Sequence, residues 1–118
     1  MTEIETIELS RAYVSLSNAH RVGLILPMFS DDAVYTSSAV GEFIGPEAIG
    51  DMMQGFFSAY PDAFWLAENY RHEGRRVTFD FGLQATAAGS GEHLQRIGVE
   101  RIEFDDAGLI RKLEVKAS

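Results

Sequence analysis

The amino-acid sequence predicts an α+β fold in which helices pack on one side of an antiparallel sheet. Apolar residues recur at helical spacing only before Pro61, whereas the chain after Pro61 alternates between apolar and polar residues and is interrupted by hairpin turns. Helices collected at one end of a chain and a meander at the other are typical of this class. With 118 residues, the chain is also long enough to form one domain with its own hydrophobic core.

The first helix is predicted from a capping box and an apolar stripe. Thr2 and Glu5 have the spacing at which each side chain can bind the backbone N–H of the other, and Glu3 and Glu8 place negative charge near the helix start. The helix is expected to end around residues 17–20. Its apolar face is expected to comprise Leu9, Ala12, Tyr13 and Leu16.

Two further helical segments are expected before Pro61. A short one spans residues 24–29, contains Pro27, and is expected to end at Asp31 and Asp32. A longer one begins at residues 45–47, where proline takes the first helical position, and ends at Pro61. This longer helix has the clearest apolar stripe of the chain: Ile49, Met52, Met53, Phe56, Phe57 and Tyr60.

Six strands are predicted, two before the long helix and four after it. Their expected ranges are Ala33–Ser38, Val40–Ile44, Ala63–His72, Arg76–Ala87, His93–Asp105 and Leu109–Val115. A tight hairpin turn at residues 105–108 joins the last two strands. Glycines at positions 82 and 98 interrupt the two longest strands, so the sheet is expected to bend there.

Alternation assigns the side chains of the strands to faces. Tyr35 and Ser37 share parity and are expected to face inward together. In the strand over residues 76–87 the inward face is expected to hold Val77, Phe79, Phe81, Leu83 and Ala85. In the strand over residues 93–105 one parity is shared by Leu94, Gly98, Glu100, Ile102 and Phe104. The opposite parity of that strand places Ile97 and Val99 outward.

Composition and charge exclude several classes of protein. Ten basic residues against 18 acidic ones give a formal net charge of −8, which argues against nucleic acid or an anionic membrane as partner. The absence of cysteine excludes disulfides, thiolate nucleophiles and iron–sulfur clusters. Because the chain has no long apolar run and no basic leader followed by one, a cytoplasmic location is expected. The three histidines lack metal-ligand spacing, so neither a metal nor a cofactor is expected.

Five stretches, in this order along the chain, resemble the nuclear transport factor 2-like superfamily, and within it the SnoaL-like polyketide cyclases and ketosteroid isomerases. They are Tyr13–Ala19, Met28–Tyr35, Gly45–Ile49, Tyr60–Asp62 and Arg101–Ile110. The resemblance implies a single SnoaL-like domain over residues 1–118. It implies a cystatin-like α+β barrel, in which a cone-shaped, curved antiparallel sheet wraps around the N-terminal helices. It also implies a mostly apolar pocket and a homodimer.

The same resemblance implies three catalytic candidates. Tyr13, five residues before Asn18, takes the place of the tyrosine that donates to the substrate oxyanion in the isomerases. Glu100 stands where the isomerases have their partner aspartate, and Ser37 stands where they have the aspartate that serves as general base. A serine cannot remove a proton from carbon without a base of its own, and no histidine is expected beside it, so Ser37 argues against the unmodified isomerase mechanism.

Each candidate also has a structural alternative. Glu100 shares parity with apolar residues, so burial should raise its pKa and keep it protonated, unless an arginine across the sheet pairs with it. Tyr13 is either a functional donor or a core tyrosine with its hydroxyl at the rim of the pocket. Asp80, on a polar strand face, is either a replacement base or the partner of Arg71 or Arg76.

The leading hypothesis is a cofactor-free protein that binds a hydrophobic or polycyclic carbonyl compound and, if catalytic, isomerises or cyclises it by proton transfer. Aromatic side chains are expected to bind this ligand: Tyr35, Phe43, Phe56, Tyr60, Trp65 and Phe104. The alternative is a non-catalytic ligand-binding or dimerisation module that pairs through Ile97 and Val99. A third hypothesis, an epoxide hydrolase, needs an Asp-Arg-Asp set, for which the chain offers Asp80, Arg96 or Arg101, and Glu100.

Overall fold

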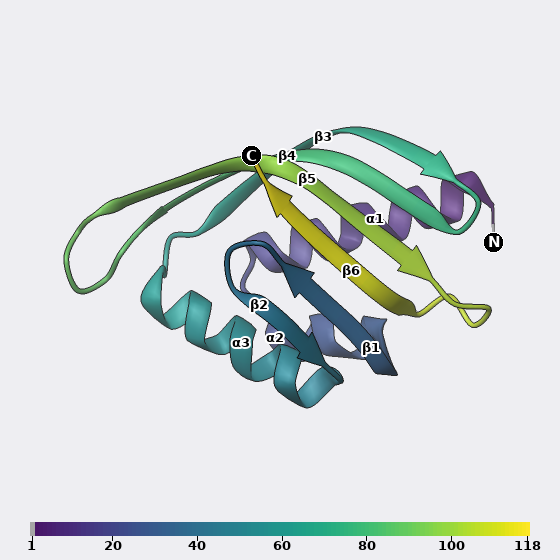
Figure 1. Cartoon of the computed structure of the whole chain (residues 1–118), viewed down its shortest axis with the longest axis horizontal. Coiled ribbons are helices and arrows are strands. Elements are labelled where there is room, and N and C mark those ends of the chain that lie inside the picture. The colour runs from purple at the N-terminus through teal and green to yellow at the C-terminus, as the bar shows by residue number, and fades with distance from the viewer. Residues whose placement is uncertain (1) are drawn as a thin grey trace.

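Helices and strands appear in the order that the sequence predicts in the computed structural model, which describes residues 2–118 (Figure 1). The helices are α1 (Glu3–Asn18), α2 (Val22–Ile25) and α3 (Pro46–Ala59), and a 3₁₀ turn, η1 (Leu26–Met28), follows α2 directly. The strands are β1 (Phe29–Ser37), β2 (Gly41–Ile44), β3 (Phe64–Glu73), β4 (Arg76–Thr86), β5 (His93–Phe104) and β6 (Ile110–Ala117).

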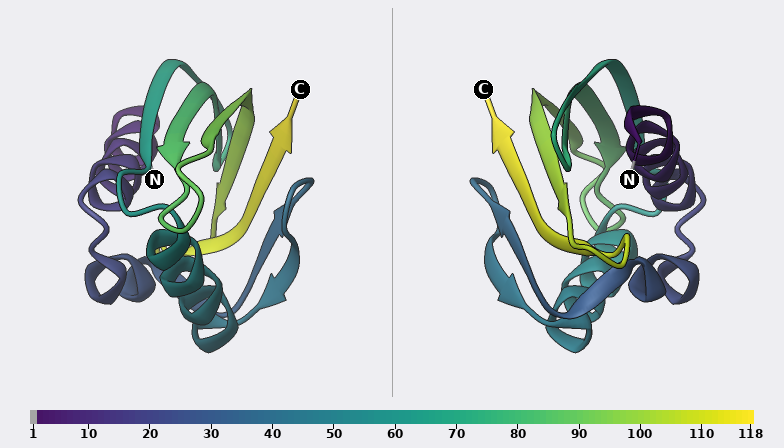
Figure 2. Two further views of the ribbon diagram at one scale, coloured as in Figure 1. Left: turned by 90° about the vertical axis from the view of Figure 1, so that its left-hand side faces the viewer. Right: turned by 90° about the vertical axis from the view of Figure 1, so that its right-hand side faces the viewer.

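All six strands belong to one curved sheet with the order β2-β1-β6-β5-β4-β3. Helix α1 packs against β3 and β4, and α3 packs against β1 and β2, so helices line the inside of the curve (Figure 2). The α+β fold class is therefore confirmed. The sheet is mixed, however, because β1 and β6 run parallel while every other pair is antiparallel. Hairpin signals report only neighbours in sequence, so they could not reveal this long-range pair.

The inward face of α1 differs from the predicted apolar stripe. Ala12 is exposed, and the buried residues are Thr6, Ser10, Tyr13, Val14 and Ser17. The hydroxyls of Ser10 and Ser17 donate to the carbonyl four residues earlier, at 2.9 and 2.8 Å, and these bonds allow polar side chains to be buried in a helix. The predicted capping box of Thr2 and Glu5 is present.

The second helical segment is shorter than predicted, and the strand after it starts earlier. The chain changes to a 3₁₀ turn around Pro27 and is already extended at Phe29. Asp31 and Asp32, expected to end the helix, instead lie in β1, where both are exposed. Strand β1 begins at Phe29, which pairs with Ile110 of β6, and its register shifts between Phe29 and Val34.

Two of the stretches that carry the family resemblance fix the chain around the helices. The amide of Asn18 holds both backbone groups of Trp65, accepting from its N–H at 2.7 Å and donating to its carbonyl at 2.9 Å. The carboxylate of Asp62 accepts from the N–H of Thr86. These bonds join the end of α1 to the start of β3, and the turn after α3 to the end of β4.

The hydrophobic core lies between the helices and the inner face of the sheet. Its fully buried members include Val77, Phe79, Ile102, Ile110 and Leu113. Among residues 2–118, no helix is both long and apolar enough to cross a membrane.

Candidate functional site

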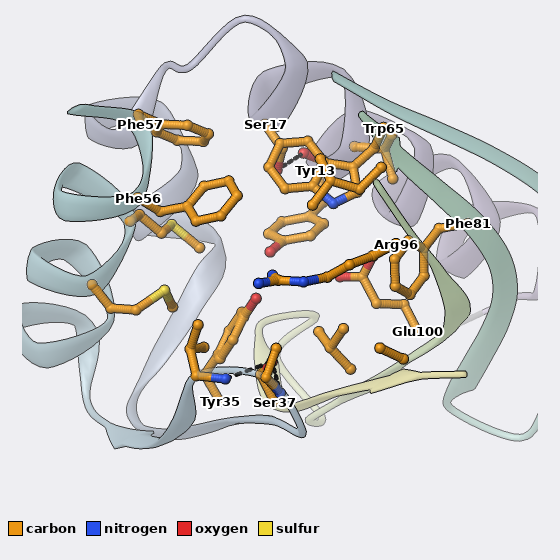
Figure 3. A pocket seen from close by; sticks show the side chains of 18 residues that line it. Tyr13, Ser17, Tyr35, Ser37, Phe56, Phe57, Trp65, Phe81, Arg96 and Glu100 are labelled. Atoms are coloured by element: carbon orange, nitrogen blue, oxygen red, sulfur yellow. Dashed lines mark hydrogen bonds between the residues drawn. The ribbon is translucent and has the colours of Figure 1, made fainter. Parts of the chain in front are cut away.

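A cavity lies between the helices and the inner face of the sheet (Figure 3), and part of its wall belongs to the hydrophobic core: Tyr13, Val14, Met53, Phe81 and Leu83. Its walls come from α1, α3 and five of the six strands or the loops beside them, and they are mainly apolar. Six lining residues bring a hydroxyl or a charged group: Tyr13, Ser17, Tyr35, Ser37, Arg96 and Glu100. The site is thus an apolar chamber with a small set of polar groups, as is typical of small-molecule sites.

The structure brings together all three residues named as catalytic candidates. Tyr13, Ser37 and Glu100 line the same cavity, although they come from α1, β1 and β5. Tyr35 lines it too, beside Ser37, as strand parity predicts. These side chains were named from helical spacing, strand parity and the family resemblance, and they line one cavity.

The aromatic residues expected to bind ligand divide into two groups. Tyr35, Phe56 and Trp65 line the cavity. The other three stand behind the lining: Phe43 packs on Tyr35, Tyr60 packs on Phe56, and Phe104 is buried in the core. Apolar character alone does not distinguish a cavity wall from the layer that supports it, so a ligand-binding role for these three stays a prediction.

Glu100 is the buried acid of the site, with only 5% of its surface exposed. No ion pair involves it among the described residues, so the alternative of a salt bridge to an arginine is wrong. Burial alone raises the pKa of this carboxyl from 4.5 to about 8. At pH 7 it is therefore mostly a neutral acid with a hydrogen to donate.

Two tyrosines accompany this acid. Burial, together with their proximity to each other and to Glu100, raises the pKa of Tyr13 well above its usual value. Burial and the nearby Glu100 likewise raise the pKa of Tyr35, and Arg96 partly opposes that shift. Both phenols therefore stay protonated at neutral pH and can donate hydrogen bonds to an oxygen in the cavity.

Ser37 has a structural task. Its hydroxyl oxygen accepts from the backbone N–H groups of Ala39 and Val40, at 3.2 and 3.4 Å, and so stabilises the turn between β1 and β2. None of the three histidines lines the cavity. His20, for example, binds the carbonyl of Ala63 and stacks on Phe57. Ser37 therefore lacks the base that a nucleophilic serine needs.

Arg96 is the site residue for which the sequence hypotheses found no place, apart from the epoxide-hydrolase alternative. It lies in β5 at the same parity as Gly98 and Glu100, so alternation could have located it. Its guanidinium points into the cavity, between the hydroxyl ends of Tyr13 and Tyr35 (Figure 3). A positive side chain on an inward row breaks the usual apolar pattern, and that break was the available signal.

Asp80 lies outside the cavity. Its carboxylate accepts from Asn69 at 3.0 Å and from Arg71 at 3.1 Å, and these bonds lower its pKa. The pairing with Arg71 is the alternative that the sequence offered. Neither a replacement base nor the Asp-Arg-Asp set of an epoxide hydrolase is therefore assembled around Asp80. Within the described part of the chain, no cluster of three His, Asp or Glu side chains could hold a metal ion.

Comparison with known proteins gives one family match. The family model for the SnoaL-like domain matches residues 10–113. No curated protein matches the sequence significantly.

Several solved structures share the fold. SalBIII, an epoxide hydrolase/cyclase-like enzyme with a role in pyran ring formation in the polyether salinomycin, is 16% identical with a TM-score of 0.88, over 98% of this chain and 92% of its own. AclR from Streptomyces galilaeus, a proposed hydroxylase, is 21% identical with a TM-score of 0.84, over 99% of this chain and 91% of its own. A proposed SnoaL-like polyketide cyclase from Shewanella denitrificans OS-217 is 17% identical with a TM-score of 0.84, over 99% and 92%. At these identities the likeness establishes the fold.

Proposed function

The chain belongs to the SnoaL-like domain family, and from that premise we propose that it is a polyketide cyclase-like protein that binds a hydrophobic carbonyl compound in its cavity. It acts there by transferring a proton next to the carbonyl group, without a cofactor. The whole chain, residues 1–118, serves as one SnoaL-like domain.

Glu100 carries this proposal. A general acid or base works best when its pKa lies near the working pH, because both protonation states are then populated. With a pKa of about 8, about a tenth of Glu100 is ionised at pH 7. One carboxyl can therefore remove a proton from carbon and return it elsewhere, and this makes a second acid at the position of Ser37 unnecessary.

The two tyrosines complete the proposed mechanism. When a proton leaves the carbon next to a carbonyl, negative charge builds on the carbonyl oxygen, and hydrogen-bond donors aimed at that oxygen stabilise it. Tyr13 and Tyr35 keep their protons and line the cavity together with Glu100. They are the donors, and Ser37 has no part in the proton transfer.

Deuterium uptake by an enolisable ketone tests the proposal. We expect the wild-type protein to accelerate exchange at the carbon between the ring and the carbonyl of 2-tetralone in D₂O, followed by proton NMR. Glu100→Gln should return the rate to that of buffer while leaving the fold intact. Asp80→Asn is the matched control, because it removes an acid on the outer face of the neighbouring strand.

The result also separates the proposal from its alternative. A wild-type protein that binds the ketone without accelerating exchange would be a non-catalytic binding module, which the structural task of Ser37 favours. Exchange that persists in Glu100→Gln would assign the chemistry to another group.

We also propose a homodimer formed by the outer face of the sheet. Phe64, Leu66 and Ile97 are exposed there by 55, 66 and 62%. Leu66 and Ile97 flank Gly82 in paired register, so they form one apolar row across three strands. Burial against a second copy would remove this surface from water. Sedimentation velocity at low concentration should show a dimer, and a well-behaved monomer would contradict it.

A further inference from the structure

Arg96 enters the cavity from β5, at a place where the next inward residue of this strand is a glycine. Residues 96, 98 and 100 share the inward row of this strand, and the middle one is a glycine. A Cβ atom at Gly98 would lie 2.1 Å from the backbone oxygen of Lys116, so β5 approaches β6 here more closely than any side chain permits. The long side chain of Arg96 extends into the chamber, and Gly98 has no side chain that could lie beside it.

The guanidinium of Arg96 has no partner among the residues that the structure describes. No described carboxylate lies within 4.0 Å of it, and no hydrogen bond joins it to residues 2–118. The chamber wall also contains the carboxyl group of Glu100. This carboxyl is mostly protonated at pH 7 and is then uncharged. The polar end of the chamber thus carries a single positive charge although the whole chain carries −8.

A neutral apolar ligand fits this charge poorly. Such a ligand would displace water from the guanidinium and leave it buried without a counter-charge, which is among the most unfavourable arrangements in a protein interior. A carboxylate would instead meet two parallel N–H donors of the guanidinium, in the fork geometry for which arginine is suited. The hydroxyls of Tyr13 and Tyr35 lie on either side of the guanidinium (Figure 3), so they can donate to the carbonyl oxygen of a ligand whose carboxylate Arg96 binds.

We propose that Arg96 is an anion anchor and that the natural ligand is an aromatic or polycyclic carbonyl compound bearing a carboxylate. The inference rests on the proposed function, because it assigns the ligand class of the same chamber. Arg96 selects the ligand and orients its carbonyl toward Glu100. The protein discriminates against neutral compounds of the same shape, since these leave the cation unpaired.

A pair of isosteric probes tests the charge preference. 2-Naphthoate and 2-naphthamide have nearly the same size and shape and differ in charge at neutral pH. We expect isothermal titration calorimetry at pH 7 to show that the wild-type protein binds the naphthoate about 10- to 100-fold more tightly, the range for a hydrogen bond to a charged group. Both probes should enter the chamber, because its walls are mainly apolar.

Three variants assign the preference to its source. Arg96→Gln should reduce the preference for naphthoate to less than about threefold, and Arg96→Lys, which keeps the charge but loses the fork, should give an intermediate value. Arg101→Gln is the matched control, since it removes an arginine from the outer side of the same strand. It should leave the preference unchanged, and circular dichroism should show that all three variants fold.

The outcomes separate this inference from the proposed function. If wild-type protein binds both probes equally, or if Arg96→Gln keeps the preference, the anchor is overturned while the chamber remains a ligand site. If neither probe binds at millimolar concentration, the aromatic carboxylate ligand class is overturned, and 2-tetralone exchange decides the proposed function separately. If naphthoate binds as expected but 2-tetralone exchange is absent at a concentration at which the ketone is bound, the anchor stands and proton transfer does not.

Discussion

The two halves of β5 follow opposite rules. From Glu103 back to Arg101 the outward side chains are charged, and the inward residues Ile102 and Phe104 are buried in the core. Earlier in the strand, Arg96 points inward and Ile97 is 62% exposed on the outer face. A single strand thus has the ordinary pattern where it builds the core and the inverted pattern where it builds the cavity.

This difference shows where folding and function make separate demands. Burying Ile102 stabilises the fold in proportion to the apolar surface removed from water. Placing Glu100 and Arg96 inside costs free energy, because each charged form loses its hydration. Such departures from the hydrophobic pattern concentrate at functional sites, and here they meet at the boundary formed by Gly98.

Adding a side chain at this boundary is expected to have the largest effect. Gly98→Ala would place a methyl group against the backbone of β6, which cannot move away without breaking the β5–β6 pairing. We expect a loss of about 4 kcal/mol or more in the free energy of unfolding, measured by urea denaturation.

Gly82→Ala is the control for this substitution. Gly82 lies in the adjacent strand with nothing within 4 Å of the added methyl group, so stability should change by less than about 1 kcal/mol. Equal losses in the two variants would show that glycine matters for strand flexibility and not for the close approach of β5 to β6.

Glu100→Gln is expected to have a smaller effect on stability, and one that depends on pH. The folded pKa of about 8 lies above the value of 4.5 for an unburied group, so the folded state binds a proton more tightly. Wild-type stability therefore falls as pH rises from 4.5 to 8, by about 1.4 kcal/mol per pH unit. Glutamine does not ionise. Urea unfolding should show the variant gaining about 2–3 kcal/mol over wild type between pH 5 and pH 7.

The groups around Glu100 do not obscure this measurement. Those that interact with it or share its chamber are Tyr13 on α1, Tyr35 on β1, Tyr70 on β3 and Arg96 on β5. The pKa of each of these tyrosines is raised, so none of the three phenols loses its proton between pH 5 and pH 8. If the stability of Glu100→Gln relative to wild type does not increase with pH, the pKa of Glu100 is not raised in the folded protein.

The same contrast explains what the sequence could and could not predict. The second half of β5 obeys the usual alternation, so its faces, its strand and the following hairpin are all predictable. Glu100 and Tyr35 were found because strand parity placed polar groups on an inward row. The partner of β1 could not be found, because no local signal specifies that β6 pairs with it in parallel.

The layer of residues behind the cavity lining could not be predicted from local sequence patterns either. Phe43, Tyr60 and Phe104 are aromatic residues like those that line the cavity. Only the packed structure shows which aromatic rings face the cavity. Arg96 differs, because it shares the parity of Glu100, and strand alternation alone places it on the inward row. An inward charge is therefore as informative in a sequence as an inward apolar residue.

Ile97→Ser should have the smallest effect on the stability of the fold. It therefore tests the outer face of the first half of β5 separately from the cavity. Ile97 is largely exposed in the single chain, so replacing it removes little buried apolar surface, and the stability of the monomer should change by no more than about 0.5 kcal/mol. The side chain stands next to Gly82, and across that glycine from Leu66, in the row proposed to contact a second copy. Sedimentation velocity should therefore show a shift from dimer toward monomer in the variant. A dimer that survives both this change and Leu66→Ser must form through another surface, and the inverted pattern of β5 would then need a different explanation.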